Sequence, residues 1–160
     1  MNFDVRRVFA EKRLGFNTEA VNLLNNLKEN IYLDKLKTLR ILNRYDVSNI
    51  DEEDFKRSVT AVFSESNQDM VYFEDVELSG HVFAVEYLPG QYDQRADSAA
   101  QCIQIVTGKE KPPVKYARVF VLEGDLSKED IEKVKNYCIN PVDSKEAELS
   151  KPATLNEEYP

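Results

Sequence analysis

The clearest pattern along the chain is a helical one. Apolar residues recur three and four positions apart between Ala20 and Ile31, which predicts an amphipathic helix. Asn17 stands where an N-cap is expected, because its side-chain oxygen can accept from backbone N–H groups of the first turn. Phe16 and Val21 flank that start at the spacing of a hydrophobic staple.

The segments around this helix have the patterns of strands and of a second helix. Residues 3–14 are rich in Val, Phe and charged residues and end at Gly15, which predicts a strand and a turn. Residues 36–47 alternate apolar and polar positions, as a strand with one buried face does. Asp51 is expected to cap the next helix, and residues 70–78 to form a short edge strand.

From about Gly80 the same order of elements returns. Apolar positions of the first helix have apolar counterparts 76 residues later, since 96 minus 20 is 76. The pairs are Ala20 with Ala96, Leu23 with Ala99, Leu24 with Ala100, and Leu27 with Ile103. The expected caps agree at this offset, because Asn17 corresponds to Asp93 and Asp51 to Ser127. The sequence therefore predicts an internal duplication.

The second strand of each copy matches at a slightly different offset. Residues 114–123 answer residues 36–45, and 114 minus 36 is 78. At this offset Arg40 and Arg118 become equivalent, which predicts paired ion contacts near the axis relating the copies. Small loop changes explain the drift.

The register of the first strand stays open between two alternatives. Val-Phe-Ala occurs at residues 8–10 and again at 82–84, an offset of 74. Gly15 and Gly90 match instead at 75. The duplication does not depend on this choice.

These patterns predict an α/β (α+β) fold built as a two-layer sandwich. Two similar strand–helix–strand–helix repeats, related by a pseudo-twofold axis, would pack their helices on a largely antiparallel sheet. The first repeat is expected at 1–79, the second at 80–140, and a third strand only in the first copy. Residues 141–160 are polar, contain three prolines, and read as a linker leading to further domains.

Charge narrows the range of partners. The 21 basic and 29 acidic residues give a net charge of -8, which repels phosphate backbones and anionic lipid surfaces. No stretch reaches the roughly 18 apolar residues of a membrane span. We therefore expect a cytoplasmic protein with no nucleic-acid and no membrane partner.

The residues most often used in catalysis and metal binding are few. Cys102 and Cys138 are far apart and fall on the expected apolar stripes of helices, so a disulfide is not expected. His81 is the single histidine, is expected to be exposed at a strand end, and leaves no nitrogen and sulfur ligand set for zinc. We predict no catalytic and no metal-binding residue in this chain.

The densest polar cluster lies at a strand-to-helix turn, residues 88–98. In the simplest interpretation Asp93 caps the helix, and Arg95 with Asp97 forms a solvated face. An anion could also bind at the start of this helix, although the turn has a single glycine and no nucleotide-binding motif. A third interpretation is a docking surface for another domain, made of Gln91, Tyr92, Asp93, Gln94, Arg95, Asp97 and Ser98.

A long segment resembles a known family. Residues 82–104, VFAVEYLPGQYDQRADSAAQCIQ, are similar to the N-terminal region of the large, single-chain phosphoribosylformylglycinamidine synthase. Residues 43–47 and 137–142 resemble that region too, and the likeness extends over nearly the whole chain. In that family the region is similar to a dimer of a small assembly subunit, which agrees with the duplication.

The resemblance implies a role in de novo purine biosynthesis. The synthase is a ligase that uses ATP, magnesium and glutamine-derived ammonia. The family's ATP-binding and glutaminase machinery lies further along the polypeptide, so no catalytic residue carries over and no cofactor is expected in this chain, while ATP and magnesium are expected in the full-length enzyme. The implied partners are the synthetase and glutaminase domains of the same polypeptide, and a separate chain could self-associate through the surface left exposed.

A function of another class competes with this one. A tandem regulatory module similar to duplicated ACT domains would bind a small amino acid or a nucleotide at the turn Leu88–Pro89–Gly90. Such a module would gain stability from its ligand, whereas a docking domain would not.

Overall fold

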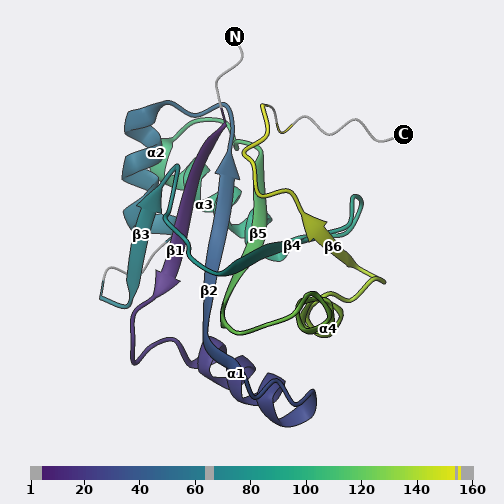
Figure 1. The fold of residues 1–160 in the computed structure, drawn as a ribbon. Helices are drawn as coiled ribbons and strands as arrows, with labels where there is room; N and C mark the ends of the chain where they lie inside the picture. The colour runs from purple at the N-terminus through teal and green to yellow at the C-terminus, as the bar shows by residue number, and fades with distance from the viewer. Residues whose placement is uncertain (1–4, 64–66, 154, 156–160) are drawn as a thin grey trace.

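The computed structural model describes residues 5–63, 67–153 and 155. Within these ranges the chain forms an α+β fold of one open, antiparallel, six-stranded sheet and four α-helices (Figure 1). The elements in chain order are β1 (Arg6–Lys12), α1 (Thr18–Asn30), β2 (Leu36–Val47), α2 (Glu52–Ser58) with a π-helical turn η1 (Val59–Phe63), β3 (Asp69–Phe73), β4 (His81–Tyr87), α3 (Gln94–Thr107), β5 (Val114–Gly124), α4 (Lys128–Cys138) and β6 (Ser144–Ala147).

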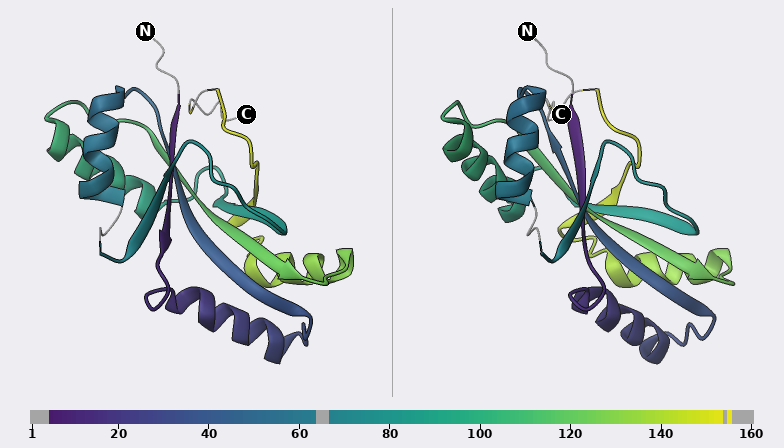
Figure 2. Two further views of the ribbon diagram at one scale, coloured as in Figure 1. Left: turned by 60° about the vertical axis from the view of Figure 1, so that its left-hand side comes forward. Right: turned by 90° about the vertical axis from the view of Figure 1, so that its left-hand side faces the viewer.

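The strand order is β3-β1-β2-β5-β4-β6, so the longest strands, β2 and β5, form the centre. They pair from Leu36 opposite Gly124 to Val47 opposite Val114, with one irregularity near Leu36. The sheet is strongly twisted, and its strands fan apart at both ends (Figure 2).

All four helices contribute to one face of the sheet, in two pairs at opposite ends (Figure 2). Helices α2 and α3 pack with Val8, Tyr45 and Tyr116, while α1 and α4 pack with Phe83 and Phe120. The two-layer arrangement expected from the apolar stripes is thus present.

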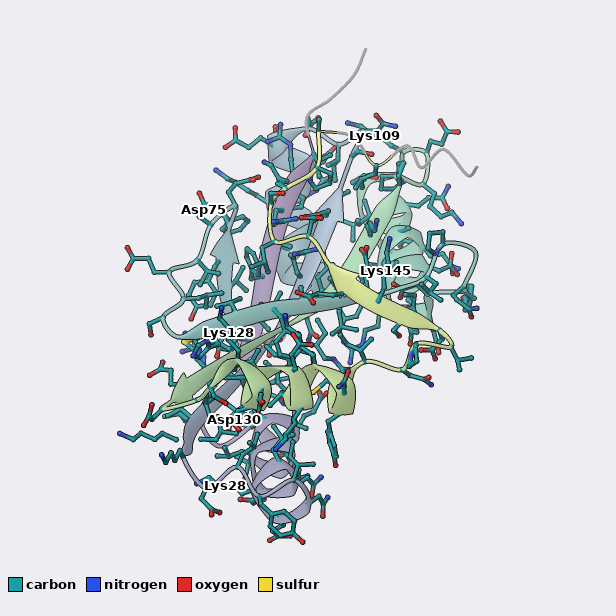
Figure 3. All side chains as sticks on the ribbon, turned by 45° about the vertical axis from the view of Figure 1, so that its right-hand side comes forward. Lys28, Asp75, Lys109, Lys128, Asp130 and Lys145 are labelled. Atoms are coloured by element: carbon teal, nitrogen blue, oxygen red, sulfur yellow. The ribbon has the colours of Figure 1, made fainter. Side chains whose placement is uncertain are left out.

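An ion pair ties α3 to α2. The Lys109 Nζ, in the turn after α3, lies 2.6 Å from the Asp54 Oδ2 of α2. Lys109 lies at the end of the molecule that carries α2 and α3, whereas Lys28 of α1 lies at the other end (Figure 3). The two helix pairs therefore have separate contacts as well as separate apolar cores.

The other face of the sheet is covered by irregular chain. Leu42 and Val119 belong to its buried cluster, against which Val76 and Leu78 of the β3–β4 connection pack. This connection crosses the sheet between the two edge regions (Figure 1). Its apolar residues do for this face what the helices do for the other.

The helix starts match the expected caps unevenly. Asp51 accepts from the Asp54 N–H at 2.7 Å, and Ser127 with Asp130 forms a capping box. Asn17 precedes α1 but makes no side-chain capping bond. Phe16 and Val21 are 49% and 46% exposed, so the expected hydrophobic staple around Asn17 does not bury its members.

Several expectations are corrected by the structure. A third strand is not confined to the first half, because residues 144–147, expected in a linker, form β6 beside β4. Residues 154 and 156–160 of that linker, and residues 3 and 4 of the first expected strand, lie outside the described residues. Cys102 is exposed and not on a buried stripe, whereas Cys138 packs against the core as expected.

The two arginines expected to be equivalent point to opposite faces. Arg118 lies opposite Asn43, whose odd-numbered neighbours on β2 face the helices, whereas Arg40 faces the other side and pairs with Glu11. Arg118 pairs instead with Glu19 of α1 at 2.7 Å. The offset of 78 is therefore wrong for these strands, because successive side chains of a strand alternate between faces.

His81 is exposed at the start of β4, as expected. No helix in the described part of the chain has both the length and the apolar character needed to cross a membrane.

Candidate functional site

The polar turn expected to be functional connects β4 to α3. Gly90 has a φ of 90°, in the left-handed region that glycine adopts without strain, and the Gln91 N–H closes the turn on the Leu88 carbonyl at 3.0 Å. Asp93 caps α3 by accepting from the Ala96 N–H at 3.1 Å. Burial raises the pKa of Asp93, although the hydrogen bonds from backbone N–H groups oppose this shift.

An exposed network extends from this turn along α3. The Tyr92 hydroxyl donates to the Asp97 Oδ2 at 2.8 Å, and the Gln101 amide donates to the same oxygen at 2.8 Å. The Lys111 Nζ lies 3.6 Å from the other carboxylate oxygen. The hydrogen bond from Tyr92 is the main reason that the pKa of Asp97 is lowered, and the same bond raises the pKa of Tyr92.

The opposite side of the α3 start faces the gap between the helix pairs. The Arg95 guanidinium lies 5.3 Å from the centre of the Tyr116 ring, a cation–π contact. The Tyr116 hydroxyl donates to the Asn43 Oδ1 at 2.6 Å, and the Tyr45 ring packs against Tyr116 at 5.2 Å. A shallow groove of about 380 Å³ lies here, lined by Tyr45, Gln94, Arg95, Ser98, Ala99 and Cys102.

The turn itself forms one wall of a larger groove of about 440 Å³. Residues 113–116 of β5 form another wall, and Leu155 reaches it from the C-terminal segment. Glu86 contributes a largely buried carboxylate, which pairs with the Lys115 Nζ at 3.3 Å. This is the groove in which the turn Leu88–Pro89–Gly90 was expected to hold a small ligand.

Sequence reasoning missed a second groove of similar size, about 370 Å³, at the end of β1. Glu11, nearly buried there, accepts from the Arg40 Nε at 2.7 Å and Nη2 at 2.6 Å. The signal was present in the sequence, because Glu11 and Glu86 have the same offset of 75 as Gly15 and Gly90.

The seven predicted site residues therefore do not form one surface. Tyr92 and Asp97 lie together on the exposed side of α3. Gln91 and Asp93 line the 440 Å³ groove, whereas Gln94, Arg95 and Ser98 line the 380 Å³ groove. The turn distributes its side chains over three neighbouring surfaces because it is tight and leads directly into a helix.

The groups that could do chemistry are dispersed. Within residues 5–63, 67–153 and 155, no three His, Cys, Asp or Glu side chains gather in a way that could hold a metal ion. Burial raises the pKa of the Cys138 thiol to about 11, so at neutral pH it is not a thiolate. His81 begins β4, whereas Ser98 and Cys102 lie on the helix that follows the other end of this strand.

The chain was compared with known proteins at this point. No protein-family model matches it, and no curated protein matches its sequence.

Proposed function

We propose that this chain is the N-terminal assembly domain of a large, single-chain phosphoribosylformylglycinamidine synthase, and that it docks the synthetase and glutaminase domains without doing chemistry itself. The proposal combines the resemblance of residues 82–104 with the surface formed by that segment. ATP and magnesium would be bound by the other domains. As part of a purine-biosynthetic ligase the chain would act in the cytoplasm.

The observation that carries the proposal is the fixed, exposed ring of Tyr92. The residue is 70% exposed, yet its hydroxyl is held by Asp97. A ring already restricted in this way loses little further conformational entropy when a partner covers it. Tyrosines of this kind are enriched among the residues that dominate binding energy at protein interfaces.

The assembly role also rests on a proposed duplication, in which the two halves are related by a pseudo-twofold axis. Adding 75 to both members of a strand pair in the first half gives a pair of the second half. Val8 opposite Tyr45 becomes Phe83 opposite Phe120. In the same way β3 opposite β1 becomes β6 opposite β4, since Ala10 opposite Val71 becomes Val85 opposite Glu146.

The centre of the sheet supports the same axis. Asn43 lies directly opposite Arg118, and 118 minus 43 is again 75, so the axis would pass between these two residues. The helix pairs exchange under this operation, because α1 corresponds to α3 and α4 to α2. The repeat would then resemble two copies of a small assembly subunit joined in one chain.

The docking role predicts that Tyr92 contributes strongly to binding. Titration calorimetry would measure the affinity of this 160-residue chain for the synthetase–glutaminase portion of the synthase, supplied as a separate polypeptide. We expect Tyr92→Ala to weaken binding by about 2 kcal/mol, a typical interface hot-spot value. Tyr32→Ala is the matched control, because Tyr32 is also highly exposed but lies beyond the far end of α1.

Three results would contradict the docking role: ATPase or glutaminase activity in the isolated chain, no binding to the synthetase–glutaminase portion, or an equal loss from Tyr32→Ala. Any one of them would leave the duplication as a structural proposal only. An independent test of the repeat is the experimental structure of the chain, with the two halves superposed at the offset of 75.

The 440 Å³ groove favours a second candidate function, a tandem regulatory module similar to duplicated ACT domains. The groove is lined by the turn Leu88–Pro89–Gly90 and contains the Glu86–Lys115 ion pair. A thermal-shift screen with amino acids and nucleotides separates the candidates. A ligand at 100 times its dissociation constant would stabilise the regulatory module by about 2.7 kcal/mol, and no ligand would stabilise a domain that only docks.

A further inference from the structure

One edge of β2 is open along half of its length. Strand β1 pairs with β2 only from Arg6 opposite Val47 to Glu11 opposite Leu42, whereas β2 begins at Leu36. Among the described residues, no strand lies beside residues 37–41 on the side away from β5. An open edge presents backbone N–H and C=O groups to which an extended peptide can pair.

This edge opens into the 370 Å³ groove, whose walls are mainly apolar. Leu14, Ala20, Leu39 and Met70 are among its lining residues. Leu14 is 90% exposed, so its side chain is available to a partner. The groove can therefore bury apolar side chains next to a backbone that is able to pair.

The charges in the groove are already satisfied within the chain. Both oxygens of Glu11 accept from Arg40, at 2.7 and 2.6 Å, and the Tyr72 hydroxyl lies 3.3 Å from one of them. A small anion or cation would have to break this bidentate pair in order to bind. The binding capacity that remains is apolar and main-chain, which favours a peptide over an ion.

The groove of the second half indicates what kind of side chain fits. Under the offset of 75, Glu11 and Arg40 correspond to Glu86 and Lys115, which form the ion pair of the 440 Å³ groove. Leu155 of the chain's own C-terminal segment lies in that groove. The position 75 residues before Leu155 is Gly80, which has no side chain to place in the first groove.

We infer that the 370 Å³ groove binds an extended peptide segment, with a leucine-sized apolar side chain beside Leu14 and its main chain against residues 37–41 of β2. The inference rests on the proposed repeat, through the equivalence of the two grooves. The surface lies away from Tyr92, so it gives the proposed assembly domain a second and separate contact.

The test uses the 160-residue chain and a fluorescein-labelled peptide that copies residues 148–155, Glu-Leu-Ser-Lys-Pro-Ala-Thr-Leu. Fluorescence anisotropy measures binding, and amide chemical shifts in NMR spectra locate it. We expect shifts at residues 37–41, and affinity about tenfold weaker for Leu14→Asp or for a peptide with aspartate in place of its last leucine. Ile105→Asp is the matched control, because Ile105 is 81% exposed on α3, and it should leave the affinity unchanged.

Absence of binding at about 1 mM peptide, where an affinity of roughly 4 kcal/mol would be seen, overturns the inference. So do shifts confined to the groove beside Leu155, or equal losses from Leu14→Asp and Ile105→Asp. Circular dichroism and melting of both variants show that folding is unaffected. Failure here leaves the Tyr92 docking measurement untouched, and failure of that measurement leaves this one interpretable.

Discussion

The two halves of the sheet have the same pairing but different chemistry. In the first half, Arg7 lies opposite Asp46, and the two form a buried bidentate ion pair at 2.7 and 2.9 Å. The corresponding residues of the second half, Val82 and Val121, also lie opposite each other. One strand register thus accepts either an ion pair or two valines, because it fixes the distance between side chains and not their polarity.

The ion pair of the first half has an additional task. The Arg7 Nη1 donates to the Leu149 carbonyl at 2.9 Å, and the Arg44 Nη1 donates to the Glu148 carbonyl at 2.9 Å. These bonds hold the segment after β6 against the face of the sheet that lacks helices. The comparison indicates that the first half keeps its charges because they attach the end of the second half.

Removing one partner of this pair should produce the largest effect. We expect Asp46→Ala to lower the free energy of unfolding by about 3–5 kcal/mol, because Arg7 stays buried without its carboxylate. Urea denaturation measures the change.

The double variant Arg7→Val with Asp46→Val copies the second half and sharpens this comparison. It should recover most of the loss, because apolar replacement of a buried ion pair is often neutral. If the double variant were as unstable as Asp46→Ala, the bonds of Arg7 to the C-terminal segment, and not the ion pair, would dominate.

A smaller difference is expected at the helix starts, where Asp93 caps α3 but Asn17 makes no capping bond to α1. Asp93→Ala should cost about 1 kcal/mol, and Asn17→Ala should cost clearly less. Thermal unfolding of the two variants compares them directly. Equal losses would mean that Asn17 caps α1 in solution.

The pH dependence of this cap has a defined sign. The pKa of Asp93 is raised in the folded chain, so the folded state binds more protons than the unfolded state around the ordinary pKa of Asp. Its contribution should therefore decrease as pH rises through that window. Asp93→Asn, which keeps a capping side chain, should remove this component, as urea denaturation between about pH 3 and pH 6 would show.

The smallest effect concerns the exposed network at Tyr92. The pKa of Asp97 is lowered mainly by the Tyr92 hydroxyl, so its contribution to stability is present above the ordinary pKa of Asp and is lost as pH falls. In Tyr92→Phe the pKa of Asp97 should rise toward its ordinary value, as a carbon-detected NMR titration would record. An unchanged pKa would show that Lys111 and Gln101 suffice to lower it.

Much of the fold was predictable because it depends on local patterns. The apolar spacing of α1, the alternation of β2 and the caps at Asp51 and Ser127 each act within a few residues. Strand β6 was missed because Ser144–Ala147 is short, polar and at an edge, and it is a strand only because β4 pairs with it. The exposure of Cys102 was missed because the buried stripe of α3 is formed by its alanines and Ile103.

The sequence by itself determined the order of strands and helices, the approximate doubling, and the polar turn at residues 88–98. Only the tertiary structure decided the offset of 75 between strands, the division of that turn over three surfaces, and the groove at Glu11. The physical reason is that spacing along the chain specifies which side of one element is apolar, whereas register and grooves depend on which elements meet. An error of one residue in strand register turns every side chain to the opposite face.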